Sequence, residues 1–375
     1  MKIAICTDQF PPYQGGVSEV ARLQLEGLTA LGHEVRVFAP RLSGAHPDTR
    51  VVRIPTAVFA GRIGIIVSPF GITRRLRDFN PDVVHMHSIG ILAVAASAAA
   101  RRLKKPRIIT YHGAMADYLH VIRMDYSPIR RAVTYACDCY FDRCDILTAP
   151  SHRALALLKS EGVKRPMLEY VPNPIDLGLF IRSPDKDAAK RRHGVAKRAI
   201  MIFGRMSPEK NLAEAVAVFE RVARKSDAQL VFIGDGPARV DIESLVREHG
   251  LSARVRFLGY VSGQMLADAV NACDIMLTTS LTEVQPLSIL QAHACGIPVV
   301  GTDAGGVPDC IRDGENGYIV TPHAIDAYAE RCLRLLADDA LRARLADIAV
   351  KDGITYAPRT IASEYARLYM RLQKS

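Results

Sequence analysis

Residues 281–306 read LTEVQPLSILQAHACGIPVVGTDAGG, and this stretch sets the fold class that we expect. The apolar run just before it, 275–279, is typical of a strand, and apolar residues recur at helical spacing over 286–295 until a glycine and a proline stop the helix. The apolar run 297–301 predicts a second strand, so the stretch is a βαβ unit. Glu283 stands where the first strand meets the helix. Ligands bind at that edge of open α/β sheets, and a helix N-terminus there favours an anion.

Strand and helix patterns alternate in the same way along the rest of the chain. The expected strands are Lys2–Cys6, Glu34–Pro40, Pro81–His87, Arg107–Tyr111 and Cys144–Ser151 in the first half, and Ala199–Phe203, Gln229–Ile233, Arg254–Leu258 and Gly314–Val320 in the second. A length of 375 residues suits two domains. We therefore expect an α/β protein with two Rossmann-like, doubly wound parallel-sheet domains that face each other across a cleft.

The turn-like stretch Val171–Asp176 places the domain boundary. The expected division is an N-terminal domain over 1–172, a C-terminal domain over 173–355, and a last helix over 356–375 that packs back on the N-terminal domain. Apolar residues make up 49% of the chain and mean hydropathy is +0.07, which predicts a globular protein. Neither a spanning segment nor a signal peptide is expected, so we predict a cytoplasmic protein.

Eight cysteines are scattered along the chain, and no pair has CxxC spacing. Cys137, Cys139 and Cys144 lie close together, but zinc wants a fourth ligand at regular spacing. We expect reduced structural thiols and no metal.

The formal net charge is +10, and residues 1–172 carry +9 of it. Such asymmetry predicts an anionic partner for the first half, either a membrane surface, a phosphorylated acceptor or nucleic acid. The stretch that holds Tyr118, His120, Arg123, Arg130 and Arg131 mixes aromatic, apolar and basic residues. On a surface helix it fits an anionic bilayer interface, and a solvated helix with extended arginines fits equally well. The segment 62–77 allows the same two interpretations. Nucleic acid is disfavoured, because no reader motif accompanies the charge.

Glycines and histidines stand at the strand ends of the first half. Gly15 and Gly16 lie between the first strand and its helix, where glycine lets backbone amides approach a phosphate or a sugar, although a plain tight turn has the same pattern. His112 follows Arg107–Tyr111 at the sheet edge that His87 shares. Either a structural or a catalytic histidine fits this position.

Two basic residues stand in the loop after the strand Ala199–Phe203. Gly204, Arg205 and Lys210 precede a helix, and Arg supplies a planar fork for phosphate while Lys supplies a point charge. This favours a diphosphate site over a charged surface loop, although it is not a Walker A motif. Gly234 begins a similar glycine-rich turn after the next strand.

Taken in order, these features resemble the retaining GT-B glycosyltransferases, in particular the glycogen-synthase-like family four. The resemblance spans essentially the whole chain. It rests on Gly15-Gly16, the strand Pro81–His87, His112, Pro150-Ser151, Pro172-Asn173, the loop Gly204–Lys210, Gly234-Asp235-Gly236-Pro237 and the region from Glu283 to Gly306.

The resemblance implies a role for each matching residue. Gly15 and Gly16 would lie by the donor diphosphate and sugar, and His112 would touch the transferred sugar. Arg205 and Lys210 would neutralise the leaving diphosphate, with Gly204 and Gly234 in the donor-binding loops. Glu283 would begin the family's E-x7-E motif and hold sugar hydroxyls. The loop that follows would meet the sugar and the phosphate, with backbone amides wherever the residue has an N–H, and it consists of Val284, Gln285, Pro286 and Leu287. Retention of anomeric configuration without a metal or other cofactor is implied.

Two positions depart from the family pattern. The second glutamate of E-x7-E falls at Gln291, which keeps hydrogen bonding but lacks the charge that usually meets ribose hydroxyls. Pro286 stands where the family commonly has glycine, which removes one N–H. These changes bear on the choice of donor more than on the fold.

A narrower resemblance comes from Thr110-Tyr111-His112, Asp117–His120 and Thr282–Gln285, which are similar to bacterial enzymes that glucosylate diacylglycerol. We therefore expect a hexosyltransferase of glycolipid biosynthesis, peripheral at the inner face of the cell membrane. It would move a sugar from UDP or GDP to a lipid or lipid-linked glycan acceptor. The alternatives are a sugar-nucleotide epimerase or phosphorylase on the same fold, and a non-catalytic nucleotide-sugar-binding subunit.

Overall fold

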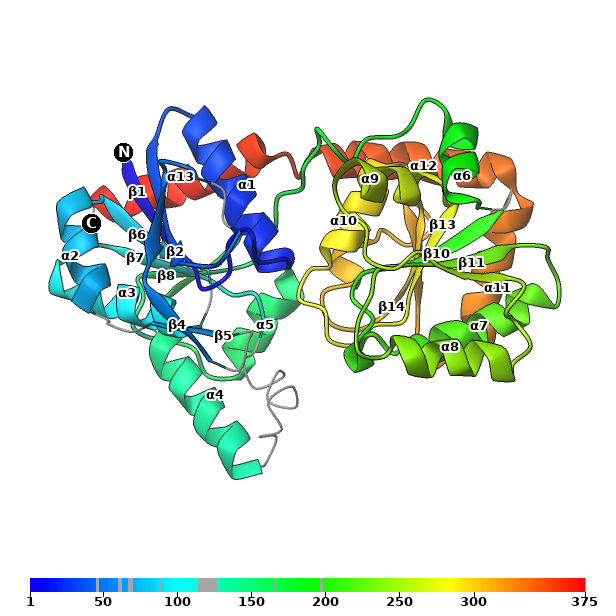
Figure 1. Cartoon of the computed structure of the whole chain (residues 1–375), viewed down its shortest axis with the longest axis horizontal. Helices are drawn as coiled ribbons and strands as arrows, with labels where there is room; N and C mark the ends of the chain where they lie inside the picture. Colours follow the sequence, from blue (N-terminus) through cyan, green and yellow to red (C-terminus); the bar gives the residue numbers. More distant parts are fainter. Residues whose placement is uncertain are drawn as a thin grey trace. The chain divides into compact units, whose positions relative to one another are not determined.

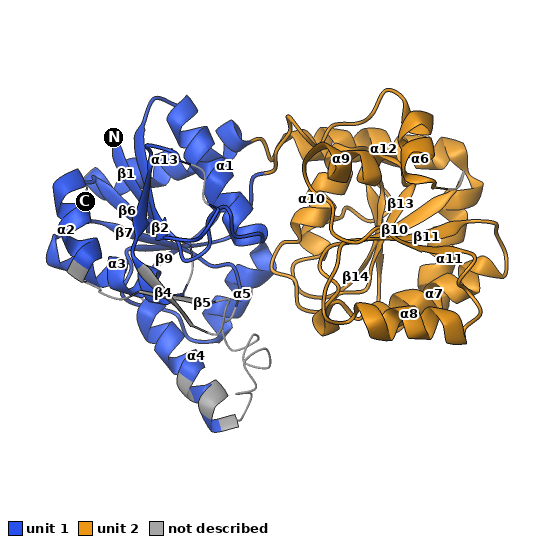
Figure 2. Cartoon of the chain, in the orientation of Figure 1, with its two compact units in different colours: residues 1–174, 358–375 blue, residues 175–357 orange. Residues whose placement is uncertain are grey.

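The computed structural model describes residues 1–44, 47–59, 63–66, 70–87, 89–113, 127–164, 166–195 and 198–374. The chain divides into two compact units (Figure 2). Unit 1 consists of Met1–Pro174 with Pro358–Ser375, and unit 2 consists of Ile175–Ala357. Each unit has a parallel sheet of its own, which confirms the predicted α/β fold. None of the described helices combines the length and the apolar character that a membrane crossing requires.

The sheet of unit 1 has seven parallel strands in the order β3-β2-β1-β6-β7-β8-β9 (Figure 1). These strands are β1 (Lys2–Cys6), β2 (Glu34–Pro40), β3 (Val51–Ile54), β6 (Val83–Met86), β7 (Arg107–Thr110), β8 (Ile146–Ala149) and β9 (Met167–Tyr170). The helices are α1 (Gly16–Ala30), α2 (Phe70–Phe79), α3 (Ile91–Arg102), α4 (Ser127–Phe141), α5 (His152–Ser160) and α13 (Pro358–Lys374). A separate antiparallel pair is formed by β4 (Thr56–Phe59) and β5 (Ile63–Ile66).

The last helix of the chain, α13, lies beside α1 and covers one face of this sheet (Figure 1). Ile361, Tyr365 and Tyr369 share a buried cluster with apolar residues of β1, β2 and β6. The two helices approach so closely that a Cβ added at Gly27 would stand 2.4 Å from the carbonyl oxygen of Pro358. The C-terminal segment is thus part of the core of unit 1.

The sheet of unit 2 has six parallel strands in the order β12-β11-β10-β13-β14-β15. They are β10 (Ala199–Phe203), β11 (Gln229–Ile233), β12 (Val255–Phe257), β13 (Ile275–Thr278), β14 (Val299–Thr302) and β15 (Gly317–Val320). The helices are α6 (Lys186–His193), α7 (Leu212–Ala223), α8 (Arg239–Glu248), α9 (Gly263–Asn271), α10 (Leu287–Ala294), α11 (Ile325–Ala337) and α12 (Asp339–Ile354).

Both faces of the second sheet are buried, which is why its strands read as continuous apolar runs. Alternate residues point to opposite faces. On β10, Ile200 and Ile202 join a cluster with α7, α8 and α11, while Met201 joins the cluster formed with α9 and α10. The sheet is therefore doubly wound, as the sequence predicts.

One expected element is wrong. The segment 62–77 was expected to be a surface helix, but Ile63–Ile66 is strand β5 and helix α2 begins only at Phe70. A run rich in isoleucine favours an extended strand over a helix. Ile72 and Leu76 of α2 are fully buried, so the apolar face of this helix packs inside unit 1 rather than against a bilayer.

Candidate functional site

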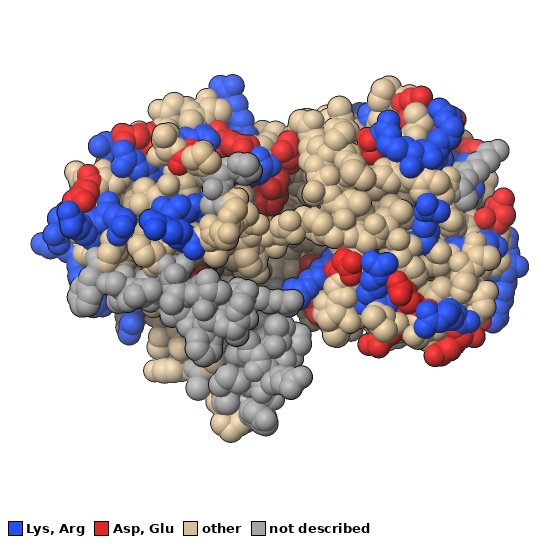
Figure 3. All heavy atoms as spheres, in the orientation of Figure 1, with Lys and Arg blue, Asp and Glu red and all other residues tan. Residues whose placement is uncertain are grey.

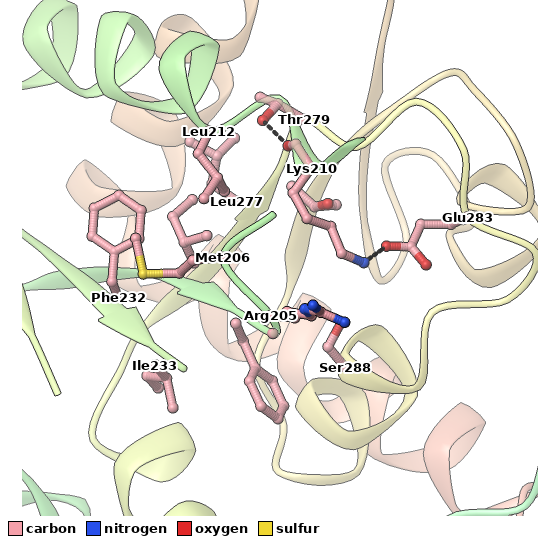
Figure 4. Close-up of a pocket in the computed structure, with 14 residues that line it drawn as sticks. Arg205, Met206, Lys210, Leu212, Phe232, Ile233, Leu277, Thr279, Glu283 and Ser288 are labelled. Carbon is pink, nitrogen blue, oxygen red and sulfur yellow. Dashed lines mark hydrogen bonds and ion pairs between the residues drawn. The ribbon is translucent and has the colours of Figure 1, made fainter. Parts of the chain in front are cut away.

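A pocket in unit 2 opens at the carboxyl ends of three neighbouring strands, β10, β11 and β13 (Figure 4). The chain leaves β10 and β13 in different directions along the sheet, so this is its topological switch point, where doubly wound sheets bind ligands. The lining residues are Ile202, Phe203, Gly204, Arg205, Met206, Lys210, Leu212, Phe232, Ile233, Leu277, Thr278, Thr279, Glu283 and Ser288.

Three charged side chains meet in this pocket. Arg205 follows β10, Lys210 ends the short 3₁₀ turn η2 (Pro208–Lys210), and Glu283 stands in the loop between β13 and α10. The ammonium of Lys210 forms an ion pair with the carboxylate of Glu283, and their side chains are 26% and 18% exposed (Figure 4). Two cations against one carboxylate leave an excess positive charge, which attracts an anion at this partly buried place.

The backbone beneath Arg205 is held by two crossing loops. Gly204 N donates to the carbonyl oxygen of Ile233 at 3.0 Å, and Gly234 N donates to that of Gly259 at 3.0 Å. A Cβ added at Gly234 would stand 2.0 Å from the carbonyl oxygen of Gly204, and Gly234 has a φ of +136°. Only glycine fits this crossing, so Gly234 shapes the pocket from beneath although it does not line it.

Two hydroxyls fix the turn that carries Lys210. Thr279 Oγ1 donates to the carbonyl oxygen of Asn211 at 2.9 Å and to that of Lys210 at 3.2 Å. Ser280 Oγ donates to the carbonyl oxygen of Glu209 at 3.3 Å. Sequence reasoning did not identify these two residues. Hydroxyl side chains directly after an apolar strand could have indicated hydrogen bonds to a neighbouring loop.

The loop of Glu283 is held by the glycine pair that ends the stretch 281–306. Gly306 N donates to the carbonyl oxygen of Glu283 at 2.6 Å. Gly305 has a φ of +51°, and a Cβ there would stand 2.4 Å from the same oxygen. The stretch therefore closes on itself, and its two ends set where Glu283 points.

The structure brings together part of the predicted donor set. Gly204, Arg205, Lys210 and Glu283 all line the pocket. The lining does not include the other predicted residues of unit 2, which are Gly234, Val284, Gln285, Pro286, Leu287 and Gln291. Apart from Gly234, these residues lie in the turn before α10 or on the helix itself. Gln285 and Gln291 are buried, while Val284 and Leu287 are half-buried.

The predicted residues of unit 1 lie at the carboxyl edge of its own sheet. Gly15 caps the N-terminus of α1 and Gly16 is its first residue. His112 comes two residues after β7, and its Nε2 lies 3.1 Å from Nδ1 of His87, which follows β6. Burial lowers the pKa of His112 to about 4, so its imidazole is neutral near pH 7.

The predicted acceptor and membrane residues are only partly described. Tyr118, His120 and Arg123 lie outside the described residues, and of Arg130 only the helical backbone is described. Arg131 is exposed on α4, and Tyr135, one turn further along, is 72% exposed. Tyr135 is a surface aromatic that sequence reasoning did not identify. Within the described ranges, no group of three or more His, Cys, Asp or Glu residues is arranged to hold a metal ion.

Two family profiles match this chain. The profile described as Glycosyltransferase Family 4 matches residues 14–179. The profile described as Glycosyl transferases group 1 matches residues 185–352. The two matches follow each other along the chain and together span most of both units.

Known proteins are similar over most of this length. A GDP-mannose-dependent alpha-mannosyltransferase of Corynebacterium glutamicum is 29% identical over 336 residues, covering 85% of this chain and 76% of that protein. An alpha-monoglucosyldiacylglycerol synthase of Acholeplasma laidlawii is 24% identical over 396 residues, covering 99% of this chain and 97% of that protein. Among solved structures, a sucrose-phosphate synthase from Thermosynechococcus elongatus superposes with a TM-score of 0.82 at 20% identity, covering 99% of each chain.

Proposed function

Since the chain belongs to the family 4, group 1 glycosyltransferases and has their GT-B fold, we propose that it moves a hexose from a UDP- or GDP-linked donor to a lipid or lipid-linked glycan acceptor at a membrane surface. The family assignment makes the protein a retaining glycosyltransferase that uses a nucleotide sugar. The base, the sugar and the acceptor belong to the proposal.

One observation carries the proposal, namely the meeting of Arg205, Lys210 and Glu283 in the pocket of unit 2. Departure of the donor diphosphate develops negative charge, and two cations fixed in advance stabilise that charge without reorganisation. The carboxylate of Glu283 accepts hydrogen bonds from sugar hydroxyls. The N-terminus of α10, beside Ser288 in the pocket lining, adds partial positive charge.

The ion pair between Lys210 and Glu283 determines the order of events that we propose for this site. Before the donor binds, each charge holds the other in place. An incoming diphosphate competes for the ammonium of Lys210 and releases the Glu283 carboxylate to the sugar. For the predicted residues of unit 1, we propose that His112 contacts the transferred sugar and that the amides at Gly15 and Gly16 meet the donor.

A lipid acceptor is supported by the surface of unit 1 and by one of its relatives. Lys and Arg side chains gather over α2 on the face shown in Figure 3, in line with the charge of +9 in residues 1–172. On α4, Arg131 and Tyr135 place an exposed cation one helical turn from an exposed aromatic side chain, a combination suited to the interface of an anionic bilayer. The A. laidlawii relative is named for a glycolipid product.

The first experiment is a donor screen by thermal shift, followed by transfer assays. A donor present at 100 times its Kd stabilises the protein by about 2.7 kcal/mol, so GDP-mannose, UDP-glucose and their counterparts are readily ranked. The preferred donor is then incubated with anionic vesicles that contain diacylglycerol, with vesicles that lack it, and without vesicles. Transfer only with a lipid acceptor supports the proposal. Isomerised or phosphorolysed sugar without any acceptor contradicts it.

Variants of the pocket test the assigned roles. Lys210→Met and Glu283→Ala are each expected to lower kcat by roughly 100- to 1,000-fold, the range for removal of one group that stabilises developing charge. Lys351→Met and Glu248→Ala are matched controls on exposed positions of unit 2 and are expected to keep full activity. Retention of wild-type turnover by either pocket variant contradicts this assignment.

A further inference from the structure

A connected set of polar side chains runs from His112 into the core of unit 1. Its members come from α1, from the ends of β6, β7 and β8, and from the C-terminal helix α13. They are Gln24, His85, His87, Thr110, Thr148, Tyr365 and Tyr369, each at most 2% exposed. A buried network of this size is costly unless every member finds a partner, which suggests that it has a specific purpose.

Gln24 joins His87 to the rest of the network. Its Oε1 accepts a short hydrogen bond from Nε2 of His87, whose other nitrogen, Nδ1, lies 3.1 Å from Nε2 of His112. The Nε2 amide of Gln24 donates to the hydroxyl of Tyr369 at 3.0 Å. The three histidine rings also stack in series, with centroids 4.4 Å apart for His85 and His87 and 5.3 Å apart for His87 and His112.

The far end of the network is equally well paired. The hydroxyl of Tyr369 lies 2.7 Å from Nδ1 of His85, and Nε2 of His85 lies 2.7 Å from Oγ1 of Thr110. Thr110 Oγ1 continues to the hydroxyl of Tyr365 at 3.0 Å and to Oγ1 of Thr148 at 2.8 Å. Hydroxyls can donate in either direction, so they adapt to whatever the histidines and the glutamine require.

The carboxamide of Gln24 gives this chain of hydrogen bonds a direction. A carbonyl oxygen only accepts, so Nε2 of His87 must carry its proton. A neutral imidazole has one N–H, which leaves Nδ1 of His87 as an acceptor. Nε2 of His112 must then donate to it, and the lone pair of His112 stays on Nδ1.

Burial in unit 1 favours the neutral form of all three imidazole rings. Burial lowers the pKa of His85 to about 3 and that of His112 to about 4, and burial beside these two rings lowers the pKa of His87 well below its usual value. The other titratable members, Tyr365 and Tyr369, have raised pKa values because they are buried, so they stay protonated. The argument for one tautomer therefore holds near neutral pH.

We propose that Gln24 and His87 are positioning residues that fix the tautomer and ring orientation of His112, so that Nδ1 of His112 is presented as a hydrogen-bond acceptor at the edge of the sheet. This inference rests on the proposed function, in which His112 contacts the transferred sugar. Tyr369 holds the amide of Gln24 in its orientation, so the last helix of the chain supports a group at the carboxyl edge of the sheet.

A pair of substitutions at His87 separates positioning from packing. An asparagine amide reaches roughly as far as Nδ1 of a histidine, whereas a glutamine amide reaches as far as Nε2. His87→Asn therefore keeps a partner for His112 and loses Gln24, while His87→Gln keeps Gln24 and loses His112. Both variants remove the same ring, so a purely structural role predicts equal losses.

We expect His87→Gln to lower kcat by on the order of 10- to 100-fold with little change in donor KM, by analogy with the loss of an orienting partner of a metal-binding histidine. His87→Asn is expected to keep at least several-fold more activity. Thermal unfolding of both variants checks that they are folded to the same extent. Equal kcat losses in the two variants overturn the proposal.

Imidazole 15N NMR reads the tautomer directly and needs no activity. With 15N-labelled histidine, the His112 signals are assigned by their loss in His112→Asn, and the wild type is expected to carry its proton on Nε2. Gln24→Met, of similar volume, is expected to give a mixture of tautomers, while Tyr365→Phe, at the far end of the network, is expected to leave the tautomer unchanged. A proton on Nδ1 in the wild type, or an unchanged tautomer in Gln24→Met, overturns the proposal. A wild type that transfers no sugar contradicts the proposed function instead, and the NMR result still decides the role of Gln24.

Discussion

Replacement of Gly234 by alanine tests whether the crossing of two backbone loops holds the pocket of unit 2 in shape. The new Cβ would stand 2.0 Å from the carbonyl oxygen of Gly204, about 1.4 Å short of the 3.4 Å at which ordinary contact begins. Neither partner moves easily. Gly204 N is bonded to the carbonyl oxygen of Ile233, and Gly234 N is bonded to that of Gly259.

Two costs add in this variant. Alanine at a φ of +136° is strained by roughly 1–3 kcal/mol. Forcing an extra methyl group into packed backbone costs about another 1–3 kcal/mol. The expected loss of unfolding free energy is therefore roughly 2–6 kcal/mol, a large part of the 5–15 kcal/mol that is typical of a whole domain.

Gly250→Ala is the matched control, because Gly250 also belongs to unit 2 and has a φ of +67°, but no heavy atom lies within 4 Å of its added Cβ. It should cost only about 1–2 kcal/mol, the strain of a left-handed alanine. Urea unfolding of both variants measures the difference, and titration with the preferred nucleotide sugar measures the pocket. We expect Gly234→Ala to lose at least twice as much unfolding free energy as Gly250→Ala. It should also bind the donor more weakly, because the new methyl group displaces Gly204 and Arg205 is the next residue. Equal stability losses in the two variants would refute the steric argument.

Two further predictions concern unit 1. The unfolding free energy should fall as pH is lowered from about 6.5 toward 4, because unfolded histidines bind protons near pH 6.5 whereas burial holds the pKa of His112 at about 4 and that of His85 at about 3. Urea titrations between pH 7.5 and 4.5 measure this slope, which should be shallower in His112→Asn; a slope identical to that of the wild type contradicts the prediction. Ser151→Ala should destabilise unit 1 by about 1 kcal/mol, because Ser151 Oγ accepts from Ala154 N at 3.2 Å and caps α5. Ser160→Ala, at the exposed end of the same helix, serves as its control, and equal thermal shifts in the two variants would argue against the cap.

The strands were the most predictable part of this fold. β1, β2, β10 and β11 have the predicted bounds, because strands buried on both faces are short, continuous apolar runs set off by polar loops. Helix α12 is not among the predicted elements, although Leu341 and Leu345 are buried in the core of unit 2. It packs on α10 through small residues, and a Cβ at Gly353 would stand 2.6 Å from Ala294. Close approach of two backbones leaves little hydrophobic pattern in the sequence.

The candidate site likewise contains residues that the sequence predicts and residues that it does not. Arg205, Lys210 and Glu283 were expected near one another because all three stand in loops that follow strands of one parallel sheet, and such loops meet at the same edge. The hydroxyls of Thr279 and Ser280 were not, because their hydrogen bonds go to residues about 70 positions earlier in the chain. The same holds for Gln24 and Tyr369, which are 345 residues apart in the sequence and hydrogen-bonded in the structure. The charged side chains that line the pocket follow from local patterns, whereas the residues that hold their loops in place depend on tertiary contacts.

The structure limits the effect that Pro286 can have on the donor site. Pro286 caps α10 with a φ of −70°, close to the value that the proline ring imposes, so the fold accepts it without strain. Its carbonyl oxygen already accepts from Ile289 N at 3.1 Å, which leaves Leu287 N and Ser288 N as the first amides of the helix. Proline thus removes one N–H just before the helix and leaves these first two helical amides unchanged. Any effect on donor choice must therefore arise at the turn before the helix, next to Glu283, rather than from a change in α10 itself.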